Sequence, residues 1–478
     1  MHLSPGRHAD FDDGCLTAHM AQDAMDGSSC GTELSLFLRP VVYSSVGGLE
    51  ELARDTHRKY EIRCPVHGFI QIDDWERQII DQPAFQRLRR IRQLAFTDLL
   101  YPAAMHTRFE HSLGVMHTAT LLYDSIVQKS GELLKQQLAY DQDGLARDRR
   151  LVRLAALLHD VGHAPFSHSS EDLFPKRGRG NEKFTHEDYS AAIIRNELRS
   201  AIEDHPLNGN TGFKADNIAA LIGKGTEAGR AVFWRDLING QMDADRMDYL
   251  IRDSHHIGVH YGKFDLRRLI LSVIAIPRDK DDRSPQLGIE EGGWHAAEAL
   301  VLARYFMFTQ VYFHKTRVAY DIHLREAMKT LLPLGRFPKP EGAELKEFLK
   351  WDDWRVLGLI GKGRAGEHGR RIIERNHFRE IYHTPEVCSD KDDRELRIVK
   401  AKLGKLVVAQ ESAKKSWYKT GNTDIPVLSK VRRPRVQPLS KYSKAIEGMK
   451  ENNQVLLYVD GADREEAEKR IRKGRQQK

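Results

Sequence analysis

Cysteines and long apolar runs are both scarce in this chain of 478 residues. The four cysteines, Cys15, Cys30, Cys64 and Cys388, are scattered along the sequence. Such scatter argues against a disulfide framework and fits a reducing compartment. No apolar run approaches the roughly 18 residues of a membrane span, and no apolar segment of a signal peptide follows the N-terminus. We therefore expect a cytoplasmic protein without a membrane partner.

The residues that are abundant describe a soluble protein. Charged residues make up 30% of the chain and hydrophobic residues 40%, which is typical of globular proteins. A chain of this length can form two or three domains around a sizeable core. The formal net charge of +7 suits a polyanionic ligand, but it does not choose between nucleic acid and small phosphates.

The first part of the chain combines a tail with a hairpin. Residues 1–55 are rich in glycine, serine, histidine and aspartate and show little periodicity, so we expect a disordered tail. The segment YEIRCPVHGFIQID alternates apolar and polar residues around a glycine, which predicts a short β-hairpin. Cys64 and His67 in its turn are half of a zinc-binding motif, but no second Cys/His pair answers them. They therefore indicate an ordinary turn.

Helical periodicity begins near Trp75 and continues to about residue 335. In IIDQPAFQRLRRIRQLAF the apolar residues recur every three to five positions, which predicts one helix face made of Ile80, Phe85, Leu88, Ile91 and Leu94. Further helices are expected at 111–128, 151–158, 186–200, 230–253, 265–273 and 294–332. The charged stretch RDKDDRSPQ within 273–293 predicts a loop or a hairpin insertion.

The C-terminal region, residues 336–478, mixes helical patterns with strand-like pieces. The segment NQVLLYVDGADREEAEKRIRKG predicts a strand followed by a capped helix. The fold class is therefore mainly α, with a helical core, a small N-terminal β-hairpin and a mixed α/β C-terminal region. We expect this region to serve in oligomerisation or regulation.

A basic segment lies within the C-terminal region. Between Lys400 and Lys444 there are twelve lysines and arginines against two acids, with Trp417 and Tyr418 among them. Such a segment can be a surface for nucleic acid or nucleotides. A solvated basic face or a subunit contact is the alternative, because runs of charge usually lie on the surface.

The segment LLHDVGHAPFSHSSE places His159 and Asp160 where an apolar helix stops. Neighbours in a regular helix point about 100° apart, but at a helix end the backbone can turn both side chains inward. A neutral imidazole and a carboxylate together suit a divalent cation such as Fe, Mn, Zn or Mg. Two ligands do not hold a metal, so further ligands must come from elsewhere in the chain.

Two other segments contain candidate ligands. HTRFEHSLGVMHTA places His111 at the start of an amphipathic helix. In MDADRMDYLIRD, the side chains of Asp245, Tyr249 and Asp253 share one helix face because they are four residues apart. Asp243 lies about 200° around the helix from Asp245, so only one of the two aims at the same centre. Two histidines and two aspartates would leave coordination positions for water and substrate, as a catalytic site requires.

These residues carry a resemblance to a known family. His111, the pair His159-Asp160 and the distant Asp245 match the H…HD…D signature of the HD-domain metal-dependent phosphohydrolases. The segments AFQRLRRIRQL, HTRFEHSLGV, LLHDVGHAPFSH, HEDYS and DADRMDYLIRDSHHIGVHYG resemble the deoxynucleoside triphosphate triphosphohydrolase (dNTPase) branch, which includes the SAM-and-HD-domain dNTPase of animals. The resemblance covers about residues 60–330, and it implies an HD core at 56–335.

The resemblance implies a role for each matching residue. It implies that a divalent metal is bound by His111, His159, Asp160 and Asp245. It implies that His186, beside Glu187, is the catalytic histidine, that His163 and His168 lie near the scissile α-phosphate, and that Glu171 orients the catalytic histidine. Attack at the α-phosphate would then release a nucleoside and intact triphosphate.

The resemblance also implies a substrate pocket. Arg108, Arg246 and Arg304 match the residues that contact the triphosphate, and relatives often have lysine where Arg246 stands. Gln93, Tyr249 and Asp253 match the deoxyribose pocket, and Leu94 and Tyr312 match positions that pack on the base. Tyr249 with Asp253 could instead be a feature of helix packing, and Arg304 could pack between helices.

A second nucleotide site is a further implication. Asp81, Gln86 and Arg89 match positions that recognise an activating guanine nucleotide, GTP, and His314 and Lys315 match a neighbouring activator site for GTP or a dNTP. The chain departs from the family nearby, with Tyr60 and Arg63 in place of a lysine and an asparagine and CPVHG in place of DPIHG. Charged residues on a helix are also commonly structural. Such sites usually lie between subunits, so a homo-oligomer, a dimer or a tetramer, is implied.

Three functions remain open at this point. The leading interpretation is a metal-dependent hydrolase of dNTPs. The first alternative is an HD phosphohydrolase that acts on other nucleotides or on single-stranded nucleic acid. The second alternative is a nucleic-acid-binding regulatory module that uses the basic C-terminal region. The products distinguish the first two, and an intact ligand set argues against the third.

Overall fold

The computed structural model describes residues 59–178, 180–223, 229–278, 285–413, 424–429 and 434–473. The predicted N-terminal tail, and Trp417 and Tyr418 of the basic segment, lie outside these residues.

The described chain begins with the predicted β-hairpin. Strand β1 (Tyr60–Cys64) pairs with β2 (Gly68–Ile72) in antiparallel register, Tyr60 opposite Ile72 and Cys64 opposite Gly68. Gly68 has φ +78°, a conformation that glycine adopts without strain. Cys64 is a buried thiol outside any disulfide, and the CPVH segment forms the turn between the two strands.

The segment after the hairpin is a series of short helical turns. These are α1 (Asp74–Ile80), α2 (Pro83–Gln86) and the 3₁₀ turns Arg87–Arg90 and Ala95–Leu99. The prediction of one continuous helix face was wrong here, because Pro83 starts a new helix and Ile91 has an extended backbone. The five apolar residues that we expected on that face are nevertheless all buried.

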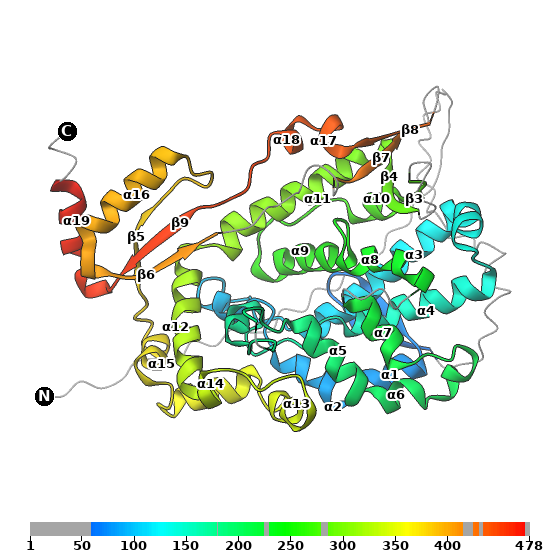
Figure 1. The fold of residues 1–478 in the computed structure, drawn as a ribbon, viewed down its shortest axis with the longest axis horizontal. Helices are drawn as coiled ribbons and strands as arrows, with labels where there is room; N and C mark the ends of the chain where they lie inside the picture. Colours follow the sequence, from blue (N-terminus) through cyan, green and yellow to red (C-terminus); the bar gives the residue numbers. More distant parts are fainter. Residues whose placement is uncertain are drawn as a thin grey trace, which may run out of the picture. The chain divides into compact units, whose positions relative to one another are not determined.

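A helical core follows (Figure 1). Its helices are α3 (Arg108–Leu138), α4 (Gln142–Leu158), α5 (His186–Asn196), α6 (Arg199–Glu203), α7 (Ala215–Ile222), α8 (Asp236–Asn239), α9 (Ala244–Ile257), α10 (Leu266–Ile270), α11 (Trp294–Met307) and α12 (Lys315–Leu331). The long helix α3 packs against both α4 and α9, and α5 packs against α7. The mainly α fold class is therefore confirmed.

Several helix boundaries differ from the prediction. Helix α4 begins at Gln142 and not near residue 151, and the helix expected at 294–332 is divided into α11 and α12 by a π-helical turn, Phe308–Tyr312. Helix α3 begins at Arg108, three residues before His111, because Thr107 and Glu110 form a capping box. The helix expected at 230–253 is broken between α8 and α9, where Asp243 caps the new helix by accepting a hydrogen bond from the Arg246 N–H.

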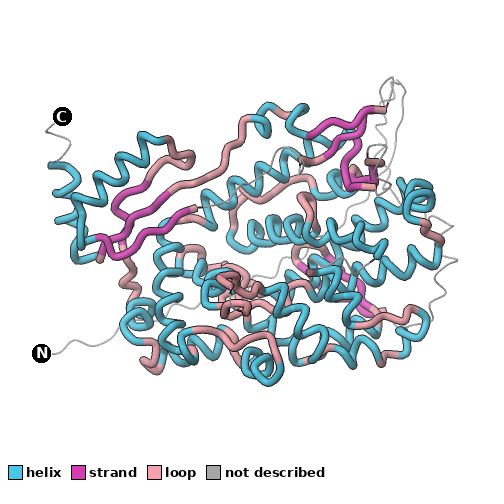
Figure 2. The backbone as a smooth tube through the Cα atoms, in the orientation of Figure 1, coloured by secondary structure: helices cyan, strands magenta, loops and turns pink. Residues whose placement is uncertain are grey.

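The expected insertion at 273–293 is a hairpin of β3 (Val273–Ile276) and β4 (Gln286–Glu290). It extends into a four-stranded sheet because β4 pairs in parallel with β7 (Pro426–Ser429), which pairs with β8 (Arg435–Pro438). Figure 2 shows this sheet and the second, C-terminal one as separate groups of strands.

The C-terminal region is mixed, as predicted. Its helices are α13 (Gly342–Leu349), α14 (Asp353–Gly361), α15 (Gly366–Ile373), α16 (Asp390–Leu403), α17 (Leu439–Tyr442), α18 (Lys444–Glu447) and α19 (Arg464–Lys473). Its antiparallel sheet has the order β5 (Arg379–His383), β9 (Val455–Val459) and β6 (Val407–Ser412). The predicted strand followed by a helix corresponds to β9 and α19.

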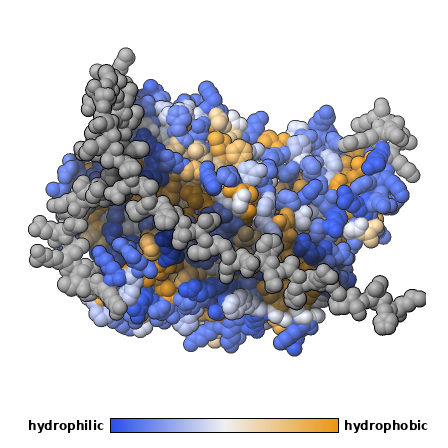
Figure 3. Space-filling view, turned by 180° about the vertical axis from the view of Figure 1, so that it is seen from behind, coloured by the Kyte–Doolittle hydropathy of each residue, from blue (hydrophilic) through white to orange (hydrophobic). Residues whose placement is uncertain are grey.

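The surface is mostly polar on the face that Figure 3 presents, with apolar residues scattered among hydrophilic ones. Among the described helices, none combines the length and the hydrophobicity needed to cross a bilayer.

Candidate functional site

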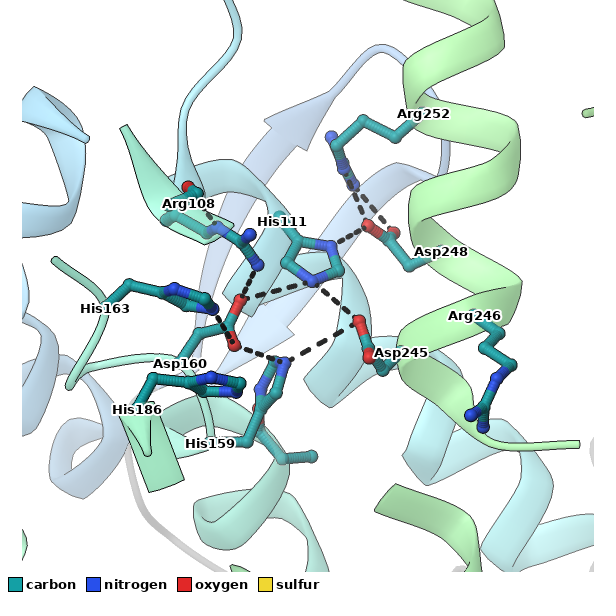
Figure 4. A network of polar contacts seen from close by, with 12 residues as sticks. Arg108, His111, His159, Asp160, His163, His186, Asp245, Arg246, Asp248 and Arg252 are labelled. Carbon is teal, nitrogen blue, oxygen red and sulfur yellow. Dashed lines mark hydrogen bonds and ion pairs between the residues drawn. The ribbon is translucent and has the colours of Figure 1, made fainter. Parts of the chain in front are cut away.

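Four predicted metal ligands meet where α3, α4 and α9 approach one another (Figure 4). His111 comes from the first turns of α3, His159 and Asp160 follow the last residue of α4, and Asp245 lies in the first turn of α9. The Asp245 Oδ1 atom lies 3.0 Å from His111 Nε2 and 3.8 Å from His159 Nε2. Asp243 instead caps α9, so only one of the two aspartates faces the centre, as expected.

Asp160 completes the group with both carboxylate oxygens. Its Oδ1 lies 3.3 Å from His159 Nε2, and its Oδ2 lies 3.5 Å from His111 Nε2. His111, His159 and Asp160 are buried, whereas the Asp245 side chain is 34% exposed. The group therefore has one open side, toward Asp245.

The donor set fits a divalent metal. Each histidine uses Nδ1 for a hydrogen bond, His111 with Asp248 at 2.8 Å and His159 with the Ala156 carbonyl at 2.7 Å. In the described part of the chain, the buried Nε2 atoms of both histidines have no hydrogen-bond partner. A buried polar atom without a partner is costly, and two imidazole nitrogens aimed at two carboxylates are what a divalent cation binds.

The charges in the group are mutually stabilised. Burial by itself lowers the pKa of His111, but the nearby carboxylates of Asp245 and Asp248 outweigh it and raise this pKa to about 9. Burial opposes the charge on Asp245 as well, yet His111 and His159 hold the pKa of that carboxyl far below its usual range. A cation would displace the protons from the histidines, since metal ligands must be deprotonated.

Gly162 allows the next helix to approach this group. A Cβ atom on Gly162 would lie 2.2 Å from the Ser190 nitrogen and 2.4 Å from the His186 carbonyl oxygen. The Gly162 N–H donates to Ser190 Oγ, and this hydroxyl donates to the His159 carbonyl. The glycine therefore lets α5 place His186 beside the candidate metal ligands.

A second cluster lies next to the ligands, and Glu171 is at its centre. Its Oε1 atom lies 2.7 Å from His186 Nδ1, 3.0 Å from His168 Nδ1 and 3.6 Å from His163 Nδ1. The rings of His163 and His186 stack with centroids 4.1 Å apart. On its other side, His163 Nε2 lies 3.2 Å from Asp160 Oδ1, so His163 connects the two clusters.

The three arginines that we expected to contact the triphosphate lie in different surroundings. Arg108 donates from Nη1 to Asp160 Oδ2 at 2.5 Å, beside the ligands. The guanidinium of Arg246 instead donates to Asp243 and to the Gly240 carbonyl, away from the ligands (Figure 4). Burial lowers the pKa of Arg304, whose charge interacts with Tyr249 and Arg246, so these residues lie near each other.

Two of the predicted sugar-pocket residues, Tyr249 and Asp253, share a contact with Tyr312. Asp253 accepts a hydrogen bond from the Tyr312 hydroxyl at 2.6 Å, and its other oxygen lies 2.7 Å from His106 Nε2. The rings of Tyr249 and Tyr312 meet edge to face. Gln93 is buried, and among the described residues its Oε1 has no hydrogen-bond partner, while the neighbouring Leu94 is also buried. The sequence analysis assigned no role to His106, although it is the first residue of the HTRFEH segment.

Asp248 is the most important residue that the sequence prediction missed. It is fully buried on α9, accepts hydrogen bonds from Nε and Nη2 of Arg252, and contacts His111 Nδ1 and, at 2.6 Å, His67 Nε2. Gly114 on α3 makes this approach feasible, since a Cβ there would lie 2.0 Å from Asp248 Oδ1. The available signals were the position of Asp248, three residues after Asp245, and the histidine in the CPVH turn.

The predicted activator residues form two separate groups. Gln86 accepts from Arg89 Nε at 2.8 Å and donates to the Ile80 carbonyl, and Asp81 lies 3.6 Å from Arg77. His314 instead caps α12, where its Nδ1 accepts from the Thr316 N–H. Lys315 follows it and lines a surface hollow of about 350 Å³ together with Thr316, His377, Phe378, Arg379, Glu380 and Arg464.

Comparison with known proteins places these residues in a family context. The model of the HD domain matches residues 108–253, and that of the HD associated region matches residues 264–411. The chain is 32% identical to the uncharacterized protein YwfO of Bacillus subtilis over 67% of this chain and 71% of the relative. It is 36% identical to the deoxynucleoside triphosphate triphosphohydrolase SAMHD1 homolog of Dictyostelium discoideum, over 66% of this chain and 58% of that protein.

A solved structure is similar over most of the chain. A hypothetical protein from Aquifex aeolicus, determined by crystallography, has a TM-score of 0.70 and 30% sequence identity, and the match covers 87% of this chain and 100% of that one. The Dictyostelium relative is longer than the part that matches, since the chain spans just over half of its length.

Proposed function

Because the chain belongs to the HD-domain family of metal-dependent phosphohydrolases, in its dNTPase branch, we propose that it hydrolyses deoxynucleoside triphosphates to deoxynucleoside and inorganic triphosphate. The observation that carries this proposal is the adjacency of two clusters. His111, His159, Asp160 and Asp245 converge, and His163 lies between them and the Glu171–His186 pair.

In this proposal the four converging residues hold one divalent cation, Fe, Mn, Zn or Mg. The cation would supply Lewis-acid polarisation of the α-phosphate and activation of water. The chain's own residues then orient the phosphate and move a proton. Arg108 already bonds Asp160 and lies beside the cation site, so its guanidinium can bind phosphate oxygens with two-point contacts.

The proton goes to the leaving oxygen. Water oxygen bonds to the α-phosphorus, the bond from phosphorus to the 5′ oxygen breaks, and the deoxynucleoside takes up a proton at that oxygen. His186 suits this transfer: burial lowers its pKa, but the hydrogen bond that it donates to Glu171, together with the negative charges of Glu171, Glu187 and Asp160, outweighs burial and raises this pKa to about 9. The ring is therefore protonated at neutral pH and acts as a general acid.

The remaining predicted contacts select the substrate. Arg246 and Arg304 would bind the outer phosphates, which requires Arg246 to leave Asp243 when a triphosphate arrives. Asp253 and Gln93 would hold the 3′-hydroxyl, because Gln93 Oε1 is a buried acceptor and Asp253 is held by Tyr312 and His106. Tyr249 would crowd a 2′-hydroxyl, which favours deoxyribose.

The test is product analysis. The purified protein is incubated with each dNTP and NTP, with Mn²⁺ or Mg²⁺, and the products are separated by chromatography. We expect equal amounts of deoxynucleoside and triphosphate from dNTPs and little turnover of NTPs. Release of pyrophosphate or single phosphates, or shortening of an oligonucleotide, would contradict the proposal and support another HD phosphohydrolase.

Activation by a second nucleotide is part of the proposal. The hollow beside Lys315 supports it, because Arg379, Arg464 and His377 line the same surface and can bind phosphate. Adding GTP to the assay, together with sedimentation in its presence and absence, tests whether activity and assembly into a dimer or tetramer rise together. Unchanged activity and unchanged mass with GTP would remove this part of the proposal.

A further inference from the structure

A buried contact links the C-terminal region to the residues from His163 to His168, called here the catalytic loop. Asp353, the first residue of α14, is 1% exposed and accepts two backbone hydrogen bonds. Its Oδ1 accepts from the Phe166 N–H at 2.7 Å, inside the catalytic loop, and its Oδ2 accepts from the Arg92 N–H at 2.8 Å.

A second contact reaches the same loop from the same region. Arg87, itself 1% exposed, donates from Nη2 to the His163 carbonyl at 2.8 Å and from Nε to the Trp351 carbonyl at 2.9 Å. The residues Trp351 to Asp353 therefore hold the catalytic loop at two points, one through Arg87 at His163 and one directly at Phe166.

The loop needs such support because its backbone is strained. Phe166 has φ +59° and Ser167 has φ +56°. This is a left-handed backbone conformation that residues other than glycine and asparagine rarely adopt. Such conformations persist only when the surroundings hold them in place, and they occur mainly at functional sites. Here both strained residues are buried, so the support must come from the protein and not from water.

The strained turn also determines how the site is assembled. Ser167 Oγ donates to the Arg92 carbonyl at 2.7 Å and accepts from Arg108 Nε at 2.9 Å, while Arg108 bonds Asp160. Arg92 thus makes two backbone contacts here: its carbonyl accepts from Ser167, and its N–H donates to Asp353. One carboxylate thus fixes both sides of the turn that places His163 and Arg108.

We propose that Asp353 is a positioning residue that holds the catalytic loop in its strained conformation, so that His163 stands between Asp160 and Glu171. This inference rests on the proposed function for its catalytic consequence only. Misplacement of a reacting group by about 1 Å can cost about 100-fold in rate. The region after the HD core therefore acts on catalysis indirectly, through the backbone of the loop.

The variant that tests this is Asp353→Asn. Asparagine has the same shape but offers one acceptor oxygen, so one of the two N–H groups faces an amide NH₂. The matched control is Asp352→Asn, because the Asp352 carboxylate instead bonds Arg90 and caps α14 at the Arg355 N–H, a role that asparagine can also fill. Hydrogen exchange of the full-length protein, resolved to the peptide that contains the loop, measures the contact without any substrate.

We expect exchange at the loop to become roughly tenfold to hundredfold faster in Asp353→Asn, as for loss of a hydrogen bond to a charged group, and to stay as in wild type in Asp352→Asn. We also expect kcat for triphosphate release to fall about tenfold or more, with KM and bound metal nearly unchanged. Unchanged exchange together with a kcat within about twofold of wild type would overturn the proposal.

Two further results separate a failure of the proposed function from a failure of the positioning role. If wild type releases no triphosphate but the loop still opens in Asp353→Asn, the proposed function fails and the positioning role stands. If Asp353→Asn does not fold, Arg87→Lys decides, because lysine cannot donate to both the His163 and the Trp351 carbonyls from a planar fork. Faster loop exchange in Arg87→Lys supports the proposal, and wild-type exchange with wild-type kcat refutes it.

Discussion

Replacing Asp248 with asparagine should weaken metal binding by about 10-fold to 100-fold, the usual effect of losing a partner behind a metal ligand. Asp248 Oδ2 lies 2.8 Å from His111 Nδ1, which fixes the ring so that Nε2 faces Asp245 and Asp160. Asparagine removes the negative charge that makes the imidazole a better ligand. The loss corresponds to about 1.4 to 2.7 kcal/mol of binding free energy.

The same substitution affects folding, and this effect must be separated from the first. Asp248 is also the partner of Arg252, and both side chains are 0% exposed. Breaking a buried ion pair from one side costs about 3–5 kcal/mol of stability, because the remaining charge is left uncompensated. Arg252→Gln is the matched control, since it breaks the same pair but leaves Asp248 against His111.

The assay is competition for Mn²⁺ between the metal-free protein and a chelating dye, with circular dichroism to confirm that each variant is folded. We expect both variants to melt at lower temperature than wild type, but only Asp248→Asn to lose metal affinity by tenfold or more. An affinity of Asp248→Asn within about twofold of wild type, or an equal loss in Arg252→Gln, would refute the positioning of His111 by Asp248.

Three other predictions follow from the site. The pKa of His186 is raised to about 9, so kcat should fall as pH rises through that value. The Glu171→Gln variant should show this fall at lower pH. An unchanged pH profile would exclude Glu171 as the cause of the raised pKa. Gly162→Ala places a Cβ 2.2 Å from backbone, so the free energy of unfolding should drop by about 1–3 kcal/mol. Gly131→Ala, with no described atom within 4 Å of its Cβ, should not lower the melting temperature. Saturating Mn²⁺, at about 100 times its Kd, should stabilise wild type by about 2.7 kcal/mol, whereas equal stabilisation of Asp160→Ala would argue against this metal site.

The sequence predicted the elements whose signals are local. Periodicity identified the helical core, and the alternation around Gly68 identified the hairpin. It failed between Trp75 and Leu100, where apolar spacing is helical but the chain folds as short turns. Burial of alternate turns gives the same spacing as one helix face, so periodicity cannot distinguish them; Pro83 was the warning.

The candidate site was predictable only where residue type and spacing carried the signal. His159 and Asp160 stand out because acids and histidines are unexpected at the end of an apolar helix. Asp248 and Asp353 do not stand out, since an aspartate on a helix surface and one at a helix start are both ordinary in sequence. Their importance arises from burial against His111 and Phe166, which depends on contacts between segments far apart in the chain.

The surroundings of the two stacked histidines favour one of them as the proton donor in the proposed reaction. Burial, with the charges of Arg108 and His186, lowers the pKa of His163 well below its usual value, so this ring is neutral. Burial also lowers the pKa of His186, but Glu171, with Glu187 and Asp160, outweighs it and raises this pKa to about 9. Groups whose pKa values are pushed apart by their surroundings divide acid and base roles between them. In the proposed reaction His186 would therefore carry the proton for the leaving oxygen, while neutral His163, held against Asp160 by the catalytic loop, can donate or accept one hydrogen bond without repelling Arg108.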